Sequence, residues 1–516
     1  MNLFRAIATV GGYTLASRIA GFVRDILIAA IIGASMVGDA FFVAFKIPNL
    51  SRRLFGEGAF AAGFVPIFSS TLERDGPEAA RAFAEDALAI LAVTLGVMLA
   101  LFELAMPWLM LGLAPGFAAD PAKFDLAVAL TRITFPYLLL VSLVSLYAGV
   151  LNCLGRFAVA AATPILLNLC LIGALLGLRD ALPTPGHALA WGVAAAGVAQ
   201  LVWIVLATAR AGVRLRLHRP RFTPKVRDLL RRMMPATVGS GVAQINIAVD
   251  VILASLLPAG SVSYLFFADR LTQLPLGILG AATGTALLPL LSRSVGRGDG
   301  AGAQATFNRA AEVALLLALP SSVALVAVAQ PIVHVLFERG AFDAAATAAT
   351  AQAVWAYALG VPAYVLIKVL SPGFFANGDT KTPVLIGVAA MLANLVLNLL
   401  LMGPLLHAGL ALATAIAAWA NAALLYVFLR RRGFFVPDAA LRRALPRVAI
   451  ATAGLGAALW FATDRMSPWF AGSEPVRAAA LTALVVGGIV LYAALAHVTG
   501  AATFGRILRL VGRRGH

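Results

Sequence analysis

The sequence predicts an all-α polytopic membrane protein with about 14 transmembrane helices. Only 12% of its 516 residues are charged and 61% are hydrophobic, whereas a soluble protein of this size carries about twice as much charge. Apolar runs of roughly 20 residues recur along the whole chain, and each can cross a hydrocarbon core of about 30 Å as a helix. Gly and Pro inside many of these runs fit the same interpretation, because membrane helices tolerate both.

The apolar runs follow one another without a loop long enough for a folded soluble domain. The first run is interrupted by Arg18 and Arg24, and no small-residue cleavage site follows it. We therefore interpret it as a retained helix and not as a signal peptide. The predicted spans are centred near residues 18, 50, 97, 140, 168, 198, 245, 276, 320, 360, 393, 418, 455 and 488.

Basic residues gather in the loops that follow the even-numbered spans. The stretch "ARAGVRLRLHRPRFTPKVRDLLRRM" alone holds nine Lys or Arg and one Asp, whereas alternate loops such as "GASMVGD" have no Lys or Arg. Because positive charge stays on the cytoplasmic side, both termini are predicted to be cytoplasmic. The net charge of +17 is thus explained by topology, and we expect no nucleic-acid partner.

The chain repeats itself at an offset of 225 residues. "DILIAAIIGASMVGDAFFVAF", from Asp25, matches "DVILASLLPAGSVSYLFFADR", from Asp250, and a second matching pair ends at Asn152 and Asn377. Two matches at one offset indicate duplication of a six-span unit, a plan in which transporters bind substrate between two lobes. We predict an N-terminal lobe (1–210), a basic cytoplasmic linker (211–222), a C-terminal lobe (223–432) and an appended helix pair with a basic tail (433–516).

Charged residues inside the first two spans are the strongest functional signal. Each costs roughly 2.5–3.5 kcal/mol at the centre of a bilayer helix, so such residues usually face a bundle interior or a wet cavity. Asp39, Lys46 and Arg53 lie seven residues apart and share one face of an ideal helix, with Glu57 one turn below Arg53. The residues concerned are Arg18, Arg24, Asp25, Asp39, Lys46, Arg52, Arg53 and Glu57.

Two plainer interpretations compete with a functional one. Arg52 and Arg53 lie toward the cytoplasmic end of span two and can snorkel to the interface, and Asp25 and Asp39 can cap loops instead of forming a functional pair. The second half carries only Asp269 and Arg270 in the corresponding stretch, so positive charge is concentrated in the first half. A cationic cavity attracts an anion, and the arginine fork suits phosphate.

Several motifs together resemble the MurJ (MviN) family of lipid II flippases, which belongs to the MOP exporter superfamily. They are "SRIAGFVRD", "GDAFFVAFKIPNLSRRLFGEGAFAAGFVPIF", "APGF", "ITFPYLLL", "FFADRLTQLPLGILG" and "VLSPGFFANGDTKTPV". The resemblance implies fourteen spans, two six-helix lobes and an appended pair whose groove holds a lipid tail. It also implies cavity arginines at Arg18, Arg24, Arg52 and Arg270, basic cavity positions at Lys46 and Arg53, and acidic positions at Asp39 and Glu57. Gln273 departs from members that have an acidic residue there.

The resemblance implies that the chain carries lipid II, an undecaprenyl-diphosphate disaccharide-pentapeptide. It would move from the cytoplasmic to the periplasmic leaflet of the bacterial inner membrane by alternating access through a cationic central cavity. No bond is made or broken, so the chain is expected to be a transporter without a cofactor and not an enzyme. We expect a monomer in contact with membrane lipids, with cell-wall synthesis or division proteins as candidate partners.

Two energy sources are compatible with the sequence. The membrane potential supplies about 2.3 kcal/mol per elementary charge per 100 mV and would reset an empty, positively charged cavity. The other is a coupling cation, Na⁺ or H⁺. A small-ion site is suggested by Asp250, Asn394, Asn398 and Thr414, because oxygen ligands suit such an ion; ordinary interhelical hydrogen bonding is the alternative.

Two other functions compete with lipid II transport. A flippase for another polyprenyl-diphosphate-linked glycan, of the O-antigen type, shares the same charge requirements. A membrane glycan polymerase is less favoured, because the sequence has no P-loop, His-Glu-x-x-His or nucleophile-elbow motif.

Overall fold

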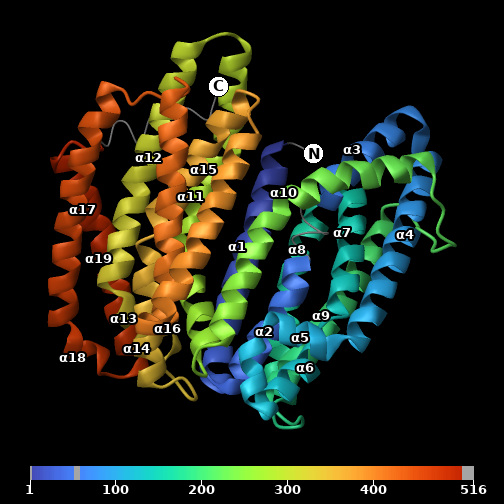
Figure 1. Ribbon diagram of the computed structural model, residues 1–516, viewed down its shortest axis with the longest axis horizontal. Coiled ribbons are helices and arrows are strands. Elements are labelled where there is room, and N and C mark those ends of the chain that lie inside the picture. Colours follow the sequence, from blue (N-terminus) through green and yellow to red (C-terminus); the bar gives the residue numbers. More distant parts are fainter. Residues whose placement is uncertain (1–2, 52–58, 503–516) are drawn as a thin grey trace. The chain divides into compact units, whose positions relative to one another are not determined.

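The computed structural model describes residues 3–51 and 59–502, and every regular element in that part of the chain is a helix (Figure 1). This confirms the all-α membrane fold that the sequence predicts. The chain forms two compact units. The first comprises residues 1–263 with the short segment 339–342, and the second comprises residues 264–338 and 343–516.

The first unit consists of long apolar helices whose ends follow from turn and capping residues. Gly33, at φ +67°, follows α1 in the left-handed conformation that commonly ends helices. Asp120 caps α6 by accepting the N–H groups of Ala122 and Lys123. The helices are α1 (Leu3–Ile32), α2 (Met36–Ser51), α3 (Ala59–Arg74), α4 (Gly76–Leu104), α5 (Met106–Leu113), the 3-10 helix η2 (Pro115–Ala119), α6 (Pro121–Thr134), α7 (Tyr137–Cys153), α8 (Phe157–Leu178), α9 (Pro185–Arg210) and α10 (Pro224–Ser255).

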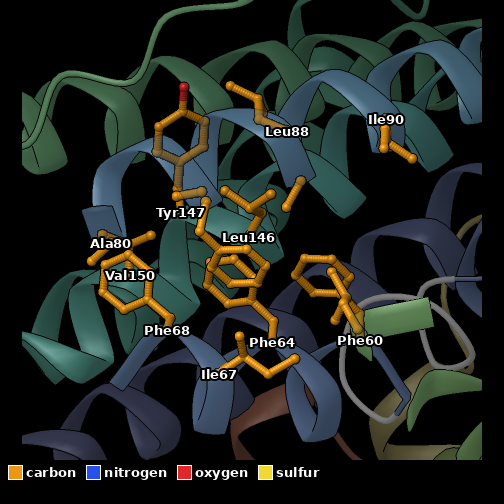
Figure 2. Packing of buried hydrophobic residues seen from close by; sticks show 14 of the residues in the cluster. Phe60, Phe64, Ile67, Phe68, Ala80, Leu88, Ile90, Leu146, Tyr147 and Val150 are labelled. Carbon is orange, nitrogen blue, oxygen red and sulfur yellow. The ribbon is translucent and has the colours of Figure 1, made fainter. Parts of the chain in front are cut away.

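An aromatic cluster joins α3, α4 and α7 in this unit (Figure 2). Phe60, Phe64 and Phe68 recur every fourth residue and therefore lie on one face of α3. Their rings stack at centroid distances of 5.1 and 5.5 Å, and Phe83 of α4 stacks on Phe64 at 5.4 Å. Offset-stacked rings add about 0.5–1.5 kcal/mol per pair beyond the area that they bury, so the cluster fixes how these helices pack.

The segment 339–342 belongs to the first unit because it packs against the end of α1. The backbone N–H of Ala341 donates to the carbonyl of Ala30 at 2.8 Å. Gly33 lies against the same segment, and a Cβ atom added to it would lie 2.3 Å from the carbonyl oxygen of Ala341. Neither the backbone conformation nor the space at Gly33 accepts a side chain.

We expect Gly33→Ala to lower the free energy of unfolding by about 1–3 kcal/mol from backbone strain alone, with the collision at Ala341 adding to that loss. Thermal unfolding in detergent measures the effect. Gly12→Ala is the matched control, because Gly12 lies in α1 with no atom within 4 Å of an added Cβ. An equal melting temperature for both variants would contradict the prediction.

The second unit contains the remaining helices. One of them, α16, consists of two helices that meet at a kink. Leu406, at φ 50° and ψ −131°, breaks α16, and it separates the spans predicted around residues 393 and 418. The helices are α11 (Ser261–Gly296), which begins in the first unit, α12 (Gly300–Ala327), α13 (Ala329–Phe337), α14 (Ala344–Ala358), α15 (Val361–Ala376), α16 (Lys381–Arg431), α17 (Ala439–Arg465), α18 (Ser467–Phe470) and α19 (Glu474–Val498).

The appended helices α17, α18 and α19 pack on the rest of the second unit through one apolar cluster. Leu455 and Leu459 of α17 and Leu484 of α19 meet Val335 of α13 there. The hydroxyl of Tyr492 also donates to the carbonyl of Leu316 at 2.6 Å. Burial of these side chains, at roughly 25 cal/mol per Å² of apolar surface, keeps the appended pair on α12 and α13.

A polar contact reinforces this attachment at the end of α13. His334 Nδ1 lies 2.7 Å from a carboxylate oxygen of Glu338, and Nε2 lies 3.0 Å from the carbonyl oxygen of Phe470. Both ring nitrogens therefore face acceptors. Burial opposes ionisation of Glu338, but the hydrogen bond from His334 and the charge of Arg477 lower its pKa below the ordinary value.

We expect Glu338→Gln to destabilise the protein at neutral pH by up to about 1 kcal/mol, the scale of a partly exposed ion pair. A carboxyl group whose folded pKa is lowered contributes stability above its ordinary pKa of 4.5 and loses it as pH falls through the folded pKa. The difference in melting temperature between wild type and Glu338→Gln should therefore shrink to zero as the pH is lowered. A difference that persists below the folded pKa would contradict this.

Nine segments of the described residues are long and apolar enough to cross a membrane. One is α16, which carries two predicted spans, and the charged helices α1 and α2 are not among the nine. Of the predicted centres, all except residue 360 lie within a helix, and residue 360 falls in the two-residue break between α14 and α15. The count of fourteen spans stays a prediction.

The packing units divide the chain at a different place from the sequence repeat. Helix α10 belongs to the first unit, where a Cβ on Gly63 of α3 would lie 2.9 Å from Leu229 Cδ1. The hydroxyl of Ser255 accepts the N–H of Gly116 at 3.2 Å. The lobes 1–210 and 223–432, the linker 211–222 and the tail region 433–516 describe the duplication and stay a prediction.

Candidate functional site

The carboxylate of Asp39 is the centre of a buried polar group in the first unit. Asp39 lies in the first turn of α2 and is 1% exposed. Lys123 Nζ and the N–H of Gly260 donate to Oδ2 at 2.8 and 2.7 Å. Ser263 donates to Oδ1 from its backbone N–H at 3.0 Å and from its hydroxyl at 2.8 Å. One carboxylate thus joins α2, α6 and the start of α11.

The surroundings of Asp39 explain why the charges are stable there. The first N–H groups of a helix have no partner within the helix, and Asp39 supplies one to the start of α11. Lys123 is 6% exposed, and its ammonium lies 4.2 Å from the centre of the Phe117 ring, a favourable cation–π distance. Removing either charge leaves the other buried without a counter-ion, which typically costs about 3–5 kcal/mol.

A second buried group links α1 to α8. Arg24 and Asp25 are 6% and 4% exposed. Arg24 donates to Asp25 Oδ1 from Nε at 3.0 Å and from Nη2 at 2.6 Å, and its Nη1 donates to Asn168 Oδ1 at 2.9 Å. Asn168 in turn donates to the carbonyl of Ser17 at 3.0 Å. The guanidinium is therefore held in one orientation by partners on two helices.

Of the remaining predicted residues, Arg18, Lys46 and Arg270 lie in described helices. Arg18 is exposed on α1 and Lys46 is half-buried on α2. In the second unit, the guanidinium of Arg270 lies 4.8 Å from the centre of the Phe266 ring, and Gln273 donates its amide to Asp269. Three predicted residues lie outside the described part of the chain: Arg52, Arg53 and Glu57.

The residues predicted for a coupling cation belong to both units. In the first unit, Asn246 donates to Asp250 at 3.4 Å. In the second, Asn394 and Asn398 are 3% and 0% exposed, one turn apart on α16, and the hydroxyl of Thr414 donates to the carbonyl of Leu410 at 2.9 Å. Among residues 3–51 and 59–502, no three His, Cys, Asp or Glu side chains gather as a metal site.

Three partners in these buried groups were not predicted from the sequence: Lys123, Asn168 and Ser263. A signal exists for two of them. Lys123 is a charged residue in the first turn of α6, just after the Asp-Pro that begins this helix, and Asn168 is a polar residue in the middle of the apolar helix α8. Such residues in a membrane span usually meet a polar partner. Ser263 carries no such signal, because serine is common at helix starts.

The chain is similar to known proteins over most of its length. The model of the family "Lipid II flippase MurJ" matches residues 28–480. A probable lipid II flippase MurJ of Rhizobium meliloti is 42% identical over 520 residues, covering 99% of this chain and 97% of the relative. The lipid II flippase MurJ of Burkholderia cenocepacia is 39% identical over 442 residues, covering 85% and 86% of the two chains.

Solved structures give the same picture at the level of the fold. A lipid II flippase MurJ in an inward closed conformation superposes with a TM-score of 0.77 at 26% identity, over 95% of this chain and 98% of that one. An inward-facing multidrug transporter of the MATE family superposes with a TM-score of 0.64 at 14% identity, over 81% and 94% of the two chains. The latter likeness is one of fold alone.

Proposed function

The chain belongs to the lipid II flippase MurJ family, and we propose that it moves lipid II from the cytoplasmic to the periplasmic leaflet of the bacterial inner membrane. The similarity to a probable lipid II flippase over 99% of this chain carries the proposal. The protein is a multi-pass membrane transporter and not an enzyme. Lipid II passes by alternating access through a cationic cavity, with the polyprenyl tail in lipid or against the appended helices.

The buried groups around Arg24 and Asp39 have different roles in the proposed transport. Arg24, oriented by Asp25 and Asn168, binds the diphosphate as a rigid donor, because a guanidinium fork suits phosphate oxygens. Asp39 has both oxygens engaged by protein donors, so it acts by holding α2, α6 and the start of α11 together. The further diphosphate ligands in this proposal are Arg18, Lys46, Arg52, Arg53 and Arg270, with Glu57 orienting the basic side chains.

Topology, energy source and assembly complete the proposal. Both termini are cytoplasmic and the protein works as a monomer. The membrane potential resets the empty cationic cavity, and a cation bound through Asp250, Asn394, Asn398 and Thr414 would couple transport to Na⁺ or H⁺. If flipping in vesicles is unchanged after the membrane potential is collapsed, the potential does not drive transport. Cell-wall synthesis and division proteins are the candidate protein partners.

Complementation tests the proposed function. The host's essential lipid II flippase is depleted and this chain is expressed, first as wild type and then as Arg18→Ala, Arg52→Ala or Arg270→Ala, with membrane levels measured for each. We expect wild type to restore growth and well-expressed variants to fail. If wild type reaches the membrane and the cells still lyse, another polyprenyl-linked glycan becomes the leading substrate.

A further inference from the structure

An apolar groove of about 720 Å³ lies on the exposed side of α9 in the first unit. Every residue that lines it is apolar, and all but Leu166 of α8 belong to α9. Figure 1 shows α8 and α9 next to each other in this unit, in agreement with the contacts between them. The groove is separate from the buried groups of Asp39 and Arg24.

The groove results from the order of small and large side chains along α9. Trp191 and Trp203 stand at its ends, 51% and 45% exposed, about 18 Å apart for twelve residues of helix. Between them, Ala195 and Ala199 line the groove with only a methyl group each. An exposed apolar groove of this length on a membrane span fits a hydrocarbon chain in both length and polarity.

One end of the groove is strongly basic. The indole N–H of Trp203 donates to the carbonyl of Val159 at 3.4 Å, so the start of α8 lies beside the last turns of α9. Arg210 ends α9 one turn beyond Leu206, which lines the groove, and Arg156 precedes the first residue of α8. Both arginines are exposed, and neither pairs with an acidic side chain in the described part of the chain.

We propose that this groove binds an anionic phospholipid, with one acyl chain between the two indoles and the phosphate on Arg156 and Arg210. The sequence predicts that this end faces the cytoplasm, where anionic lipids attract basic residues. A zwitterionic lipid fills the apolar groove equally well and lacks the net charge. The site does not rest on lipid II transport, because it uses no residue assigned to the substrate.

Tryptophan quenching by brominated lipid tests the site in the full chain. The protein is reconstituted in phosphatidylcholine vesicles that contain a fixed fraction of brominated phosphatidylglycerol or of brominated phosphatidylcholine. We expect more quenching by the anionic lipid, and we expect Trp191→Phe combined with Trp203→Phe to lose this excess. Arg156→Gln combined with Arg210→Gln should lower the relative affinity for the anionic lipid at least about fivefold.

The matched control removes two arginines elsewhere. Arg442→Gln combined with Arg443→Gln neutralises two exposed arginines of α17 and should leave the excess quenching intact. Equal quenching by the two brominated lipids, or an excess that survives loss of Arg156 and Arg210, would overturn the proposal. Displacement of the brominated lipid by polyprenyl phosphate and not by unlabelled phosphatidylglycerol would overturn it in favour of a polyprenyl chain.

Discussion

Asp39→Asn is expected to abolish complementation, the largest effect of any single substitution considered. The amide nitrogen cannot accept a hydrogen bond, and the ammonium of Lys123 is left buried without a counter-ion, at a cost of about 3–5 kcal/mol. The start of α11 also loses the carboxylate that accepts the N–H groups of Gly260 and Ser263. Growth of a flippase-depleted strain, together with the membrane level of the variant, measures both consequences.

Two further variants separate this effect from a general loss of charge. Asp125→Asn changes an exposed aspartate on α6, the helix that carries Lys123, and should complement like wild type. Asp39→Asn combined with Lys123→Gln removes both buried charges and should recover part of the thermal stability, since contacting residues are coupled energetically. Full growth with Asp39→Asn alone would contradict the assigned role.

Substitution of Arg24 is expected to have the second-largest effect. Arg24→Gln breaks the buried pair with Asp25 and the hydrogen bond to Asn168; breaking a buried pair typically costs about 3–5 kcal/mol. It also removes a donor proposed for the diphosphate. We expect no growth of the depleted strain. Arg24→Lys keeps the charge, but a single ammonium does not reproduce the forked contact with Asp25 and Asn168, so we expect weak growth at most.

A paired variant distinguishes binding from structure at this position. Arg24→Gln combined with Asp25→Asn removes both charges of the Arg24–Asp25 pair, so thermal stability should rise above that of Arg24→Gln. If Arg24 binds the diphosphate, this stable variant still fails to transport. Recovery of growth together with stability would show that Arg24 acts only through packing. Arg179→Gln, at an exposed arginine paired with Asp180, is the control.

Much of the fold follows from the sequence because it depends on local composition. The apolar runs predict the helices, and the charges in α1 and α2 predict buried polar groups. The pairing within those groups does not follow from spacing along one helix. The seven-residue spacing relates Asp25 to Arg18 and Asp39 to Lys46, whereas the structure pairs Asp25 with Arg24 and Asp39 with Lys123.

The difference has a physical reason. Lys123 and Asn168 lie 84 and 144 residues from their partners in the sequence, so the contacts exist only after α6 and α8 have packed against α2 and α1. Spacing rules describe which residues share a face of one helix, and a buried charge takes its partner from whichever helix covers that face. The break at Leu406 likewise lies between spans that the apolar pattern separates only roughly.

The most direct test of the account measures the leaflet in which lipid II resides. In cells depleted of their own flippase, the head group of lipid II is exposed to a membrane-impermeant hydrolase from the outside, with this chain expressed or absent. The account predicts that the hydrolase cleaves lipid II when wild type is expressed, and that lipid II stays uncleaved with the stable variant Arg24→Gln combined with Asp25→Asn. Lipid II that stays inaccessible while wild type is present in the membrane would contradict it.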